Sequence, residues 1–131
     1  MQNKTVIVSL SDEKYFELLL ELIGSINNFD QSKEVDICIL DAGMNDNQIN
    51  TLKQKVKHIK KAEWDIDVPG YKVKNKQWLK SQVSRAFLPK YFPDYENYIW
   101  IDSDAWVNDW HAVDLLIKGC KMKELAIFKL Y

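Results

Sequence analysis

The sequence predicts a single α/β domain built on a mostly parallel sheet. Short apolar runs rich in β-branched residues alternate with longer stretches of helical periodicity, which is the pattern of βαβ units. The apolar runs are nearly continuous, as expected of strands that are covered by helices on both faces. The 131 residues are 47% hydrophobic, which is enough for one core, so we expect one domain over 1–131.

The first half of the chain predicts two strand–helix pairs. Residues 5–10 form a β-branched strand, and Ser11 and Asp12 offer an N-cap to a helix with the apolar face Tyr15, Leu19, Leu22, Ile23 and Ile26. Residues 35–40 form a second apolar strand. Asn45 is then placed to cap another helix, with Gln48 three residues further on as in a capping box.

The second half continues the alternation. Residues 59–64 favour a short third strand, 65–76 a loop, and 77–91 a helix. Residues 98–101 form an apolar strand. Asn108 or Asp109 then caps a helix that we expect to end near Lys118 with Gly119 as its C′ residue, and 125–128 begin another strand.

Two aspartates stand directly after the apolar strand 98–101. Aspartate is depleted in strands, yet Asp102 and Asp104 close this one. If the strand geometry continues, both side chains point to the same side, and two partly buried carboxylates need a compensating cation or donors. Mn²⁺ or Mg²⁺ is a suitable partner, because both are hard cations that leave positions open for phosphate. The alternative is an Asx-turn with one aspartate facing water.

Charge and composition exclude several classes of protein. The formal net charge is −1, but residues 53–90 carry eleven Lys or Arg against three Asp or Glu, a segment that suits an anion such as a diphosphate. It lacks interleaved aromatics and a reading motif, so we expect no nucleic-acid partner. Two cysteines make no disulfide framework, and Cys38 is expected to be a buried free thiol. No apolar run is long enough to span a bilayer, which predicts a cytoplasmic protein, with peripheral attachment at the inner membrane as an alternative.

Four segments in order resemble the glycosyltransferases of the GT-A fold, and most closely the bacterial family 8 galactosyl- and glucosyltransferases. They are Asp12-Glu13-Lys14-Tyr15 after the first strand, Leu40-Asp41-Ala42-Gly43, Ser84 to Pro89 around Arg85, and the segment from Tyr98 to Val107 around the Asp-x-Asp. The resemblance implies a Rossmann-like, GT-A type three-layer sandwich. It also implies a nucleotide-sugar donor, expected to be a UDP-sugar, and a carbohydrate or glycolipid acceptor.

The resemblance also implies roles for individual residues. Asp102 and Asp104 would bind Mn²⁺ (or Mg²⁺) and the donor diphosphate. Donor binding is assigned to six further residues: Ser9, Leu10, Asp12, Tyr15, Arg85 and Ser103. Lys14 stands where the family often has Asn. No catalytic residue is assigned.

The family's catalytic domain is longer than this chain, so we expect the chain to correspond to its N-terminal, nucleotide-sugar-binding half. Two alternatives follow: a non-catalytic nucleotide-sugar-binding or interaction module, and a haloacid-dehalogenase-like phosphatase, whose nucleophile motif is also Asp-x-Asp. Against the phosphatase, Trp106 stands where that motif has Thr or Val. We expect His58 and His111 to be ordinary surface or packing residues rather than metal ligands. Self-association is expected if aromatic rings of this half are exposed.

Overall fold

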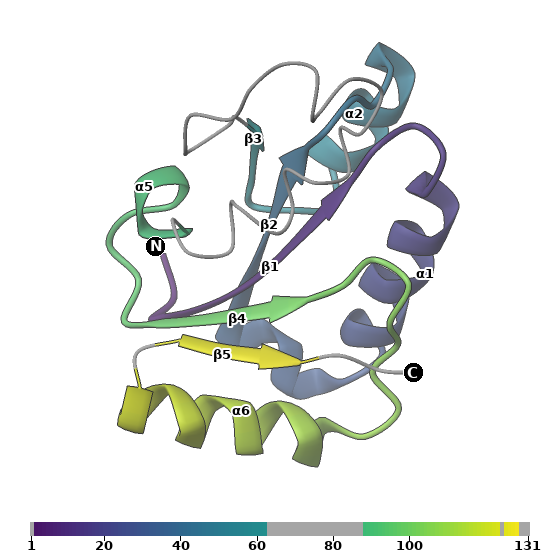
Figure 1. Ribbon diagram of the computed structural model, residues 1–131. Coiled ribbons are helices and arrows are strands. Elements are labelled where there is room, and N and C mark those ends of the chain that lie inside the picture. Colours follow the sequence, from purple (N-terminus) through teal and green to yellow (C-terminus); the bar gives the residue numbers. More distant parts are fainter. Residues whose placement is uncertain (1, 63–87, 124, 129–131) are drawn as a thin grey trace, which may run out of the picture.

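The computed structural model describes residues 2–62, 88–123 and 125–128. Within these ranges five strands form one sheet in the order β3-β2-β1-β4-β5, and every neighbouring pair is parallel (Figure 1). The strands are β1 (Thr5–Ser11), β2 (Val35–Asp41), β3 (His58–Lys61), β4 (Asn97–Ile101) and β5 (Leu125–Phe128).

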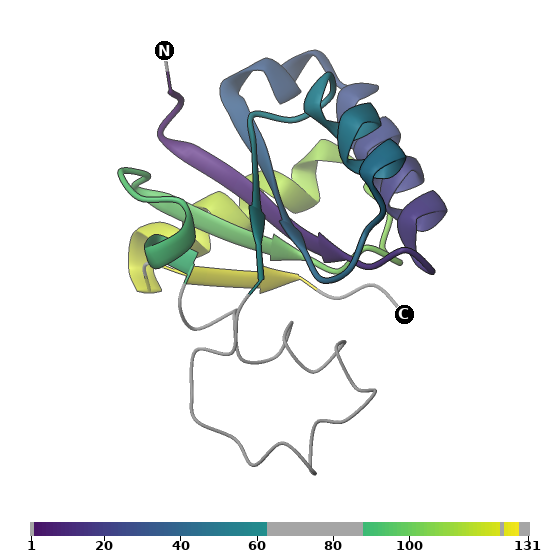
Figure 2. The ribbon, with the colours of Figure 1, turned by 90° about the horizontal axis from the view of Figure 1, so that it is seen from above.

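Helices connect these strands. They are α1 (Phe16–Asn27), the 3₁₀ helix η1 (Asp30–Glu34), α2 (Asp46–Lys53), α5 (Leu88–Tyr91) and α6 (Trp110–Lys123). Figure 2 shows α1 and α2 together on one side of the sheet. No helix in the described part of the chain is long and apolar enough to cross a membrane.

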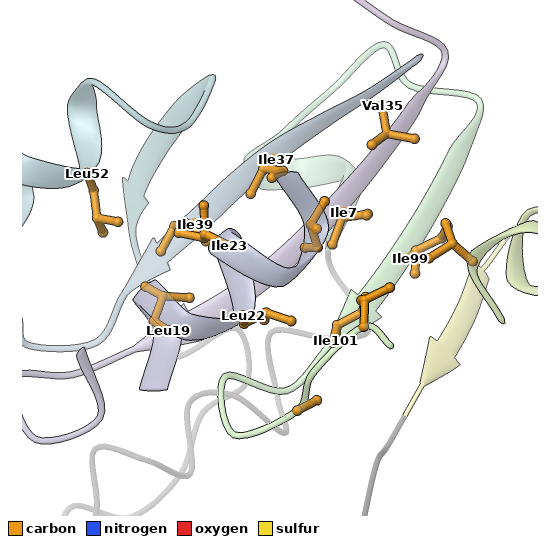
Figure 3. Close-up of a cluster of buried hydrophobic side chains, with 14 of the residues drawn as sticks. Ile7, Leu19, Leu22, Ile23, Val35, Ile37, Ile39, Leu52, Ile99 and Ile101 are labelled. Atoms are coloured by element: carbon orange, nitrogen blue, oxygen red, sulfur yellow. The ribbon is translucent and has the colours of Figure 1, made fainter. Parts of the chain in front are cut away.

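One face of the sheet is covered by α1, with contributions from α2 and α6. Side chains alternate along a strand, so the odd-numbered residues of β1, β2 and β4 point to this face. There Leu19, Leu22 and Ile23 of α1 meet isoleucines of the strands, as Figure 3 shows. The buried strand side chains of this cluster are Ile7, Val35, Ile37, Ile39, Ile99 and Ile101.

The other face carries the even-numbered strand residues. Val8, Leu40 and Trp100 pack there with side chains from α5 and the turn after it, namely Leu88, Tyr91, Phe92 and Tyr95. Because apolar groups cover both faces, every residue of β1 and β4 is buried. This double cover is the physical reason that the strands are continuous apolar runs.

Most of the predicted elements are confirmed within a residue or two. The predicted strands at 5–10, 35–40, 98–101 and 125–128 correspond to β1, β2, β4 and β5. The capping box is present, because the Asn45 side chain accepts from the Gln48 backbone N–H and the Gln48 side chain accepts from that of Asn45. Cys38 is a buried free thiol, as expected.

Three local predictions are wrong. Ser11 and Asp12 do not provide the N-cap of the first helix, because α1 begins at Phe16 and its N-cap position is Tyr15, with no side-chain cap hydrogen bond. Tyr15 does not join the apolar face of α1. It precedes the helix and is 41% exposed, while Phe16 is buried instead. Gly119 does not end α6, which continues to Lys123. Glycine in a helix costs about 1 kcal/mol relative to alanine, so it disfavours a helix interior without excluding it.

Part of the third strand and the next two predicted elements lie outside the described residues. The strand expected at 59–64 is confirmed as β3 (His58–Lys61), whereas Trp64 is not described. The loop at 65–76 and the helix at 77–91 are described only from Leu88 onward.

Candidate functional site

The carboxyl ends of β1 and β4 lie next to each other in the centre of the sheet. The chain leaves β1 toward β2 and leaves β4 toward β5, so the two connections diverge in opposite directions. Open parallel sheets bind ligands at such a point, because the diverging loops leave a crevice between them. The last residue pair in the register of these two strands is Val8 with Trp100, one residue before the end of β4.

The two aspartates are presented by a turn. β4 ends at Ile101, and the Asp102 carbonyl accepts a hydrogen bond from the Ala105 N–H at 2.9 Å. The expectation that strand geometry continues through both aspartates is therefore wrong, since the turn replaces the strict alternation of a strand. Asp102 is half-buried and Asp104 is exposed. Ser103 lies between them in the same turn and is half-buried.

Side chains hold this turn at both of its ends. The indole Nε1 of Trp100 donates to Oδ1 of Asp102 at 2.8 Å. Further along, the Val107 N–H donates to Oγ of Ser25, on α1, at 3.0 Å. The sequence analysis missed both bonds, and no sequence pattern points to a contact between positions 82 residues apart.

The loop after β1 places two of the predicted donor-binding residues at the same edge. Oδ1 of Asp12 accepts a hydrogen bond from the Tyr15 N–H at 2.9 Å, so this carboxylate shapes the turn into α1. The Tyr15 ring is exposed, with Nζ of Lys14 5.6 Å from its centre. A flat exposed ring at the carboxyl end of a central strand is available for stacking on a nucleotide base.

The loop after β2 is tied to the loop after β1. Oδ1 of Asp41 accepts from the N–H groups of Gly43 and Met44, at 2.8 and 2.7 Å. Nε2 of Gln48 then donates to the Glu13 carbonyl at 3.2 Å. The capping box of α2 thus also supports the loop that carries Asp12 and Tyr15.

Ser9 and Leu10 are enclosed within the sheet. Ser9 is 1% exposed and Leu10 is 9% exposed, and by alternation their side chains enter the two opposite cores. The Ser9 hydroxyl is buried and has no hydrogen-bond partner among the described residues. The resemblance assigns Ser9 and Leu10 to the donor slot through their backbone, and this role stays a prediction.

Arg85 lies outside the described residues, so its assignment also stays a prediction. In the described ranges no group of three or more His, Cys, Asp and Glu side chains is placed to hold a metal ion. His58 and His111 are both exposed, as expected. The assignment of a cation to the carboxylates of Asp102 and Asp104 therefore stays a prediction. Two carboxylates beside solvent suit Mg²⁺ or Mn²⁺, which fill their remaining positions with water and phosphate.

An apolar hollow of about 120 Å³ adjoins the turn, between β4 and α6. It is lined by eight residues: Ile101, Trp106, Val107, Asn108, Asp109, Ala112, Val113 and Leu116. Trp106 is 49% exposed at its rim, whereas Trp100 and Trp110 are buried. Of the aromatic residues flanking the aspartates, Trp106 thus has a ring face open to a ligand.

Comparisons with known proteins agree with the fold. Two crystal structures of the galactosyltransferase LgtC are similar to the chain, one of an active-site mutant and one in complex with donor and acceptor sugar analogues. Each has a TM-score of 0.59 and 17% sequence identity over 82% of this chain. The chain spans 41% of the length of LgtC. No curated protein matches it in sequence.

The expected GT-A type α/β fold is confirmed by this likeness and by the parallel sheet. The sequence model named "Glycosyl transferase family 8" matches residues 6–113, which run from β1 through the aspartate turn into α6. This match favours the glycosyltransferase interpretation over the phosphatase alternative. On this evidence of sequence and fold, the chain belongs to glycosyl transferase family 8.

Proposed function

We propose that this chain binds the nucleoside-diphosphate sugar donor of a glycosyltransferase at the carboxyl ends of β1 and β4. In this proposal Asp102 and Asp104 hold Mn²⁺ or Mg²⁺, and Asp12 and Tyr15 contact the nucleoside. The most suitable donor to test is a UDP-sugar, with a carbohydrate or glycolipid as acceptor.

The observation that carries the proposal is the placement of the two loops. Asp12 and the turn of Asp102 follow adjacent parallel strands whose connections diverge, which is where open parallel sheets bind ligands. One loop offers an exposed aromatic ring, and the other offers two carboxylates. A nucleoside diphosphate needs both, because its base stacks and its phosphates carry negative charge that carboxylates bind only through a cation.

The residues divide the work in the following way. Tyr15 supplies a stacking surface for the base, and the Asp12 carboxylate holds the turn that presents this ring. Asp102 and Asp104 hold the cation, which when bound neutralises the charge that develops on the departing diphosphate. Arg85 is proposed to bind phosphate or sugar hydroxyls, for which a guanidinium fork is suited.

A second candidate is a nucleotide-sugar-binding module without turnover. It is favoured by one observation, that the chain spans 41% of the length of LgtC. Donor binding is common to both candidates, so release of free sugar or sugar transfer by the 131-residue chain is the measurement that separates them. A chain that binds UDP and releases no sugar from any UDP-hexose over many hours supports the module.

The test of donor binding is a thermal unfolding experiment with UDP. A ligand at about 100 times its Kd stabilises the folded state by about 2.7 kcal/mol, which raises Tm by several degrees. We expect this rise with UDP and Mn²⁺ together, and we expect Asp102→Ala to abolish it. An equal rise in the Asp102→Ala variant would show that the cation does not bind there.

Asp114→Ala is the matched control. Asp114 is an exposed aspartate on α6, so its loss removes the same charge at a distance from the turn. This variant should keep the full rise in Tm. Calorimetric titration with UDP and GDP in the presence of Mn²⁺ then identifies the base.

A further inference from the structure

The loop that carries the two aspartates packs against the apolar core that contains α1. Its side chains alternate in exposure, since Ala105 and Val107 are each 4% exposed while Asp104 and Trp106 face solvent. The buried alanine and valine belong to the same apolar cluster as α1. The loop is thus anchored by Ala105 and Val107 and presents Asp104 and Trp106 to solvent.

Trp100 fixes the first end of this loop. Its side chain is 1% exposed and is among the largest fully buried side chains of the described chain. The indole of Trp100 lies within hydrogen-bond distance of the Asp102 carboxylate, one residue past the end of β4. A ring packed on all sides keeps its rotamer, so its N–H, 2.8 Å from Oδ1, selects one orientation of that carboxylate.

Ser25 fixes the second end. It is 2% exposed within α1, and its hydroxyl both donates to the Leu22 carbonyl at 2.7 Å and accepts from the Val107 N–H at 3.0 Å. The bond to Leu22 sets the direction of the hydroxyl proton, which leaves a lone pair for Val107. The backbone N–H of Val107 thus has its hydrogen-bond partner on α1, a helix that lies far from the loop in sequence.

We propose that Trp100 and Ser25 are positioning residues that preorganise the loop from Asp102 to Val107 for a cation bound to a diphosphate, an inference that rests on the proposed function. Neither residue touches the ligand. Their role is to reduce the conformational freedom that the two aspartates lose on binding, and a carboxylate held by a partner behind it binds a metal more tightly.

The first test needs no metal. Hydrogen exchange of the backbone amides of Ala105 and Val107 reports how often the loop opens. Trp100→Phe keeps an aromatic ring but removes the N–H donor, and Ser25→Ala removes a single oxygen. Both variants should exchange these amides faster relative to the amides of β1. Unchanged relative rates in both variants would overturn the inference, and Ser25→Ala keeps it testable if Trp100→Phe fails to fold.

The matched control is Tyr98→Phe. Tyr98 lies on the same strand and face as Trp100, is 6% exposed, and its hydroxyl donates to the Phe92 carbonyl at 2.7 Å. Its loss removes a buried hydrogen bond from β4 away from the aspartate turn. Relative exchange at Ala105 and Val107 should not change in this variant. A rise as large as that in Trp100→Phe would show that general loosening of β4 explains the effect.

The second test measures Mn²⁺ affinity by electron paramagnetic resonance in the presence of UDP. Loss of a partner behind a metal ligand weakens metal binding by about 10-fold or more, which is the expected effect of Trp100→Phe. Equal affinity in Trp100→Phe and the parent chain would overturn the positioning role. If the parent chain itself binds no Mn²⁺, the proposed function fails, and the exchange rates still decide whether these residues order the loop.

Discussion

Asp36, near the start of β2, is a carboxylate that the fold buries far from the aspartate turn. It is 8% exposed and accepts from the Tyr95 hydroxyl at 2.6 Å and from the backbone N–H and Nδ2 of Asn3, at 3.2 and 2.9 Å. A buried carboxylate is tolerated when donors replace its water. These bonds join the segment before β1 and the segment before β4 to the amino end of β2.

The Cys38 thiol beside this network makes stability depend on alkaline pH. Burial raises its pKa from 9.0 to about 11. Between these values the unfolded chain loses the thiol proton while the folded chain keeps it, so the free energy of unfolding falls as pH rises through this window. The slope contributed by one group is at most about 1.4 kcal/mol per pH unit. Urea unfolding from pH 8 to 11 measures it.

Cys38→Ala should remove this part of the slope. Burial also raises the pKa of Tyr95, so its contribution begins above the ordinary tyrosine value of about 10. Tyr95→Phe is therefore expected to keep the loss of stability between pH 9 and 10. If Cys38→Ala and the parent chain show the same slope there, the thiol does not stay protonated in the folded state.

At single residues, the sequence predicts where the two aspartates stand but not how their side chains are oriented. Asp102 and Asp104 stand out in the sequence because aspartates are unusual at the end of an apolar strand. Their relative orientation did not follow, since the hydrogen bond from Ala105 to Asp102 turns the chain immediately after Ile101. The bonds of Asp102 to Trp100 and of Val107 to Ser25 depend on packing, which leaves no periodic signal.

Among the elements, two glycines that look alike in the sequence should respond in opposite ways to alanine. Gly43 follows β2 with φ +128, where a side chain is strained, whereas Gly24 lies inside α1 with open space where a Cβ would be. Gly43→Ala is expected to cost on the order of 1–3 kcal/mol. Gly24→Ala should stabilise by roughly 0.5–1 kcal/mol, because alanine favours the helix.

Urea unfolding of the two variants at neutral pH measures both effects. The preceding residue of the same turn, Ala42, is buried and does not have a positive φ. The strain expected in Gly43→Ala therefore comes from the backbone conformation of Gly43 and not from the presence of an alanine in this turn. A stabilising effect of Gly43→Ala would mean that the turn after β2 adopts a different backbone conformation. The donor-dependent rise in Tm should persist in Gly24→Ala.

The strands and the capping box of α2 were predictable because their signals are local. The apolar runs of β1, β2 and β4 and the capping box of Asn45 are all contained within a few residues. The end of α6 was not predictable, since glycine is a common stop signal that a helix also tolerates in its interior, as at Gly119. Tyr15 matched the helical period of α1, but the bond of its N–H to Asp12 places it before the first turn.

At the scale of the whole molecule, alternation of strands and helices predicts a parallel sheet but does not determine the order of its strands. The order places β4 beside β1, although β2 and β3 separate them in the chain. This neighbour relation brings the loops of Asp12 and Asp102 together. It depends on both faces of β1 and β4 finding apolar cover, which is a property of the assembled core.

The strands share two cores, so the described chain should unfold as one cooperative unit. β1, β2 and β4 each contribute side chains to the cluster under α1 and to the cluster under α5. Leu22→Ala, which opens a cavity in the first cluster, is expected to cost about 2–5 kcal/mol. Leu18→Ala on the same helix is the control, since Leu18 is 39% exposed and its loss should cost about 0.5 kcal/mol or less.

Two probes follow the unfolding of Leu22→Ala in urea. Far-ultraviolet circular dichroism reports the helices and strands, while tryptophan fluorescence includes Trp110 in the first cluster and Trp100 in the second. Coincident transitions, shifted together to lower urea, are expected, because neither cluster keeps its strands without the other. Separate midpoints would show that the core under α5 outlasts the core under α1, and that the sheet does not couple them.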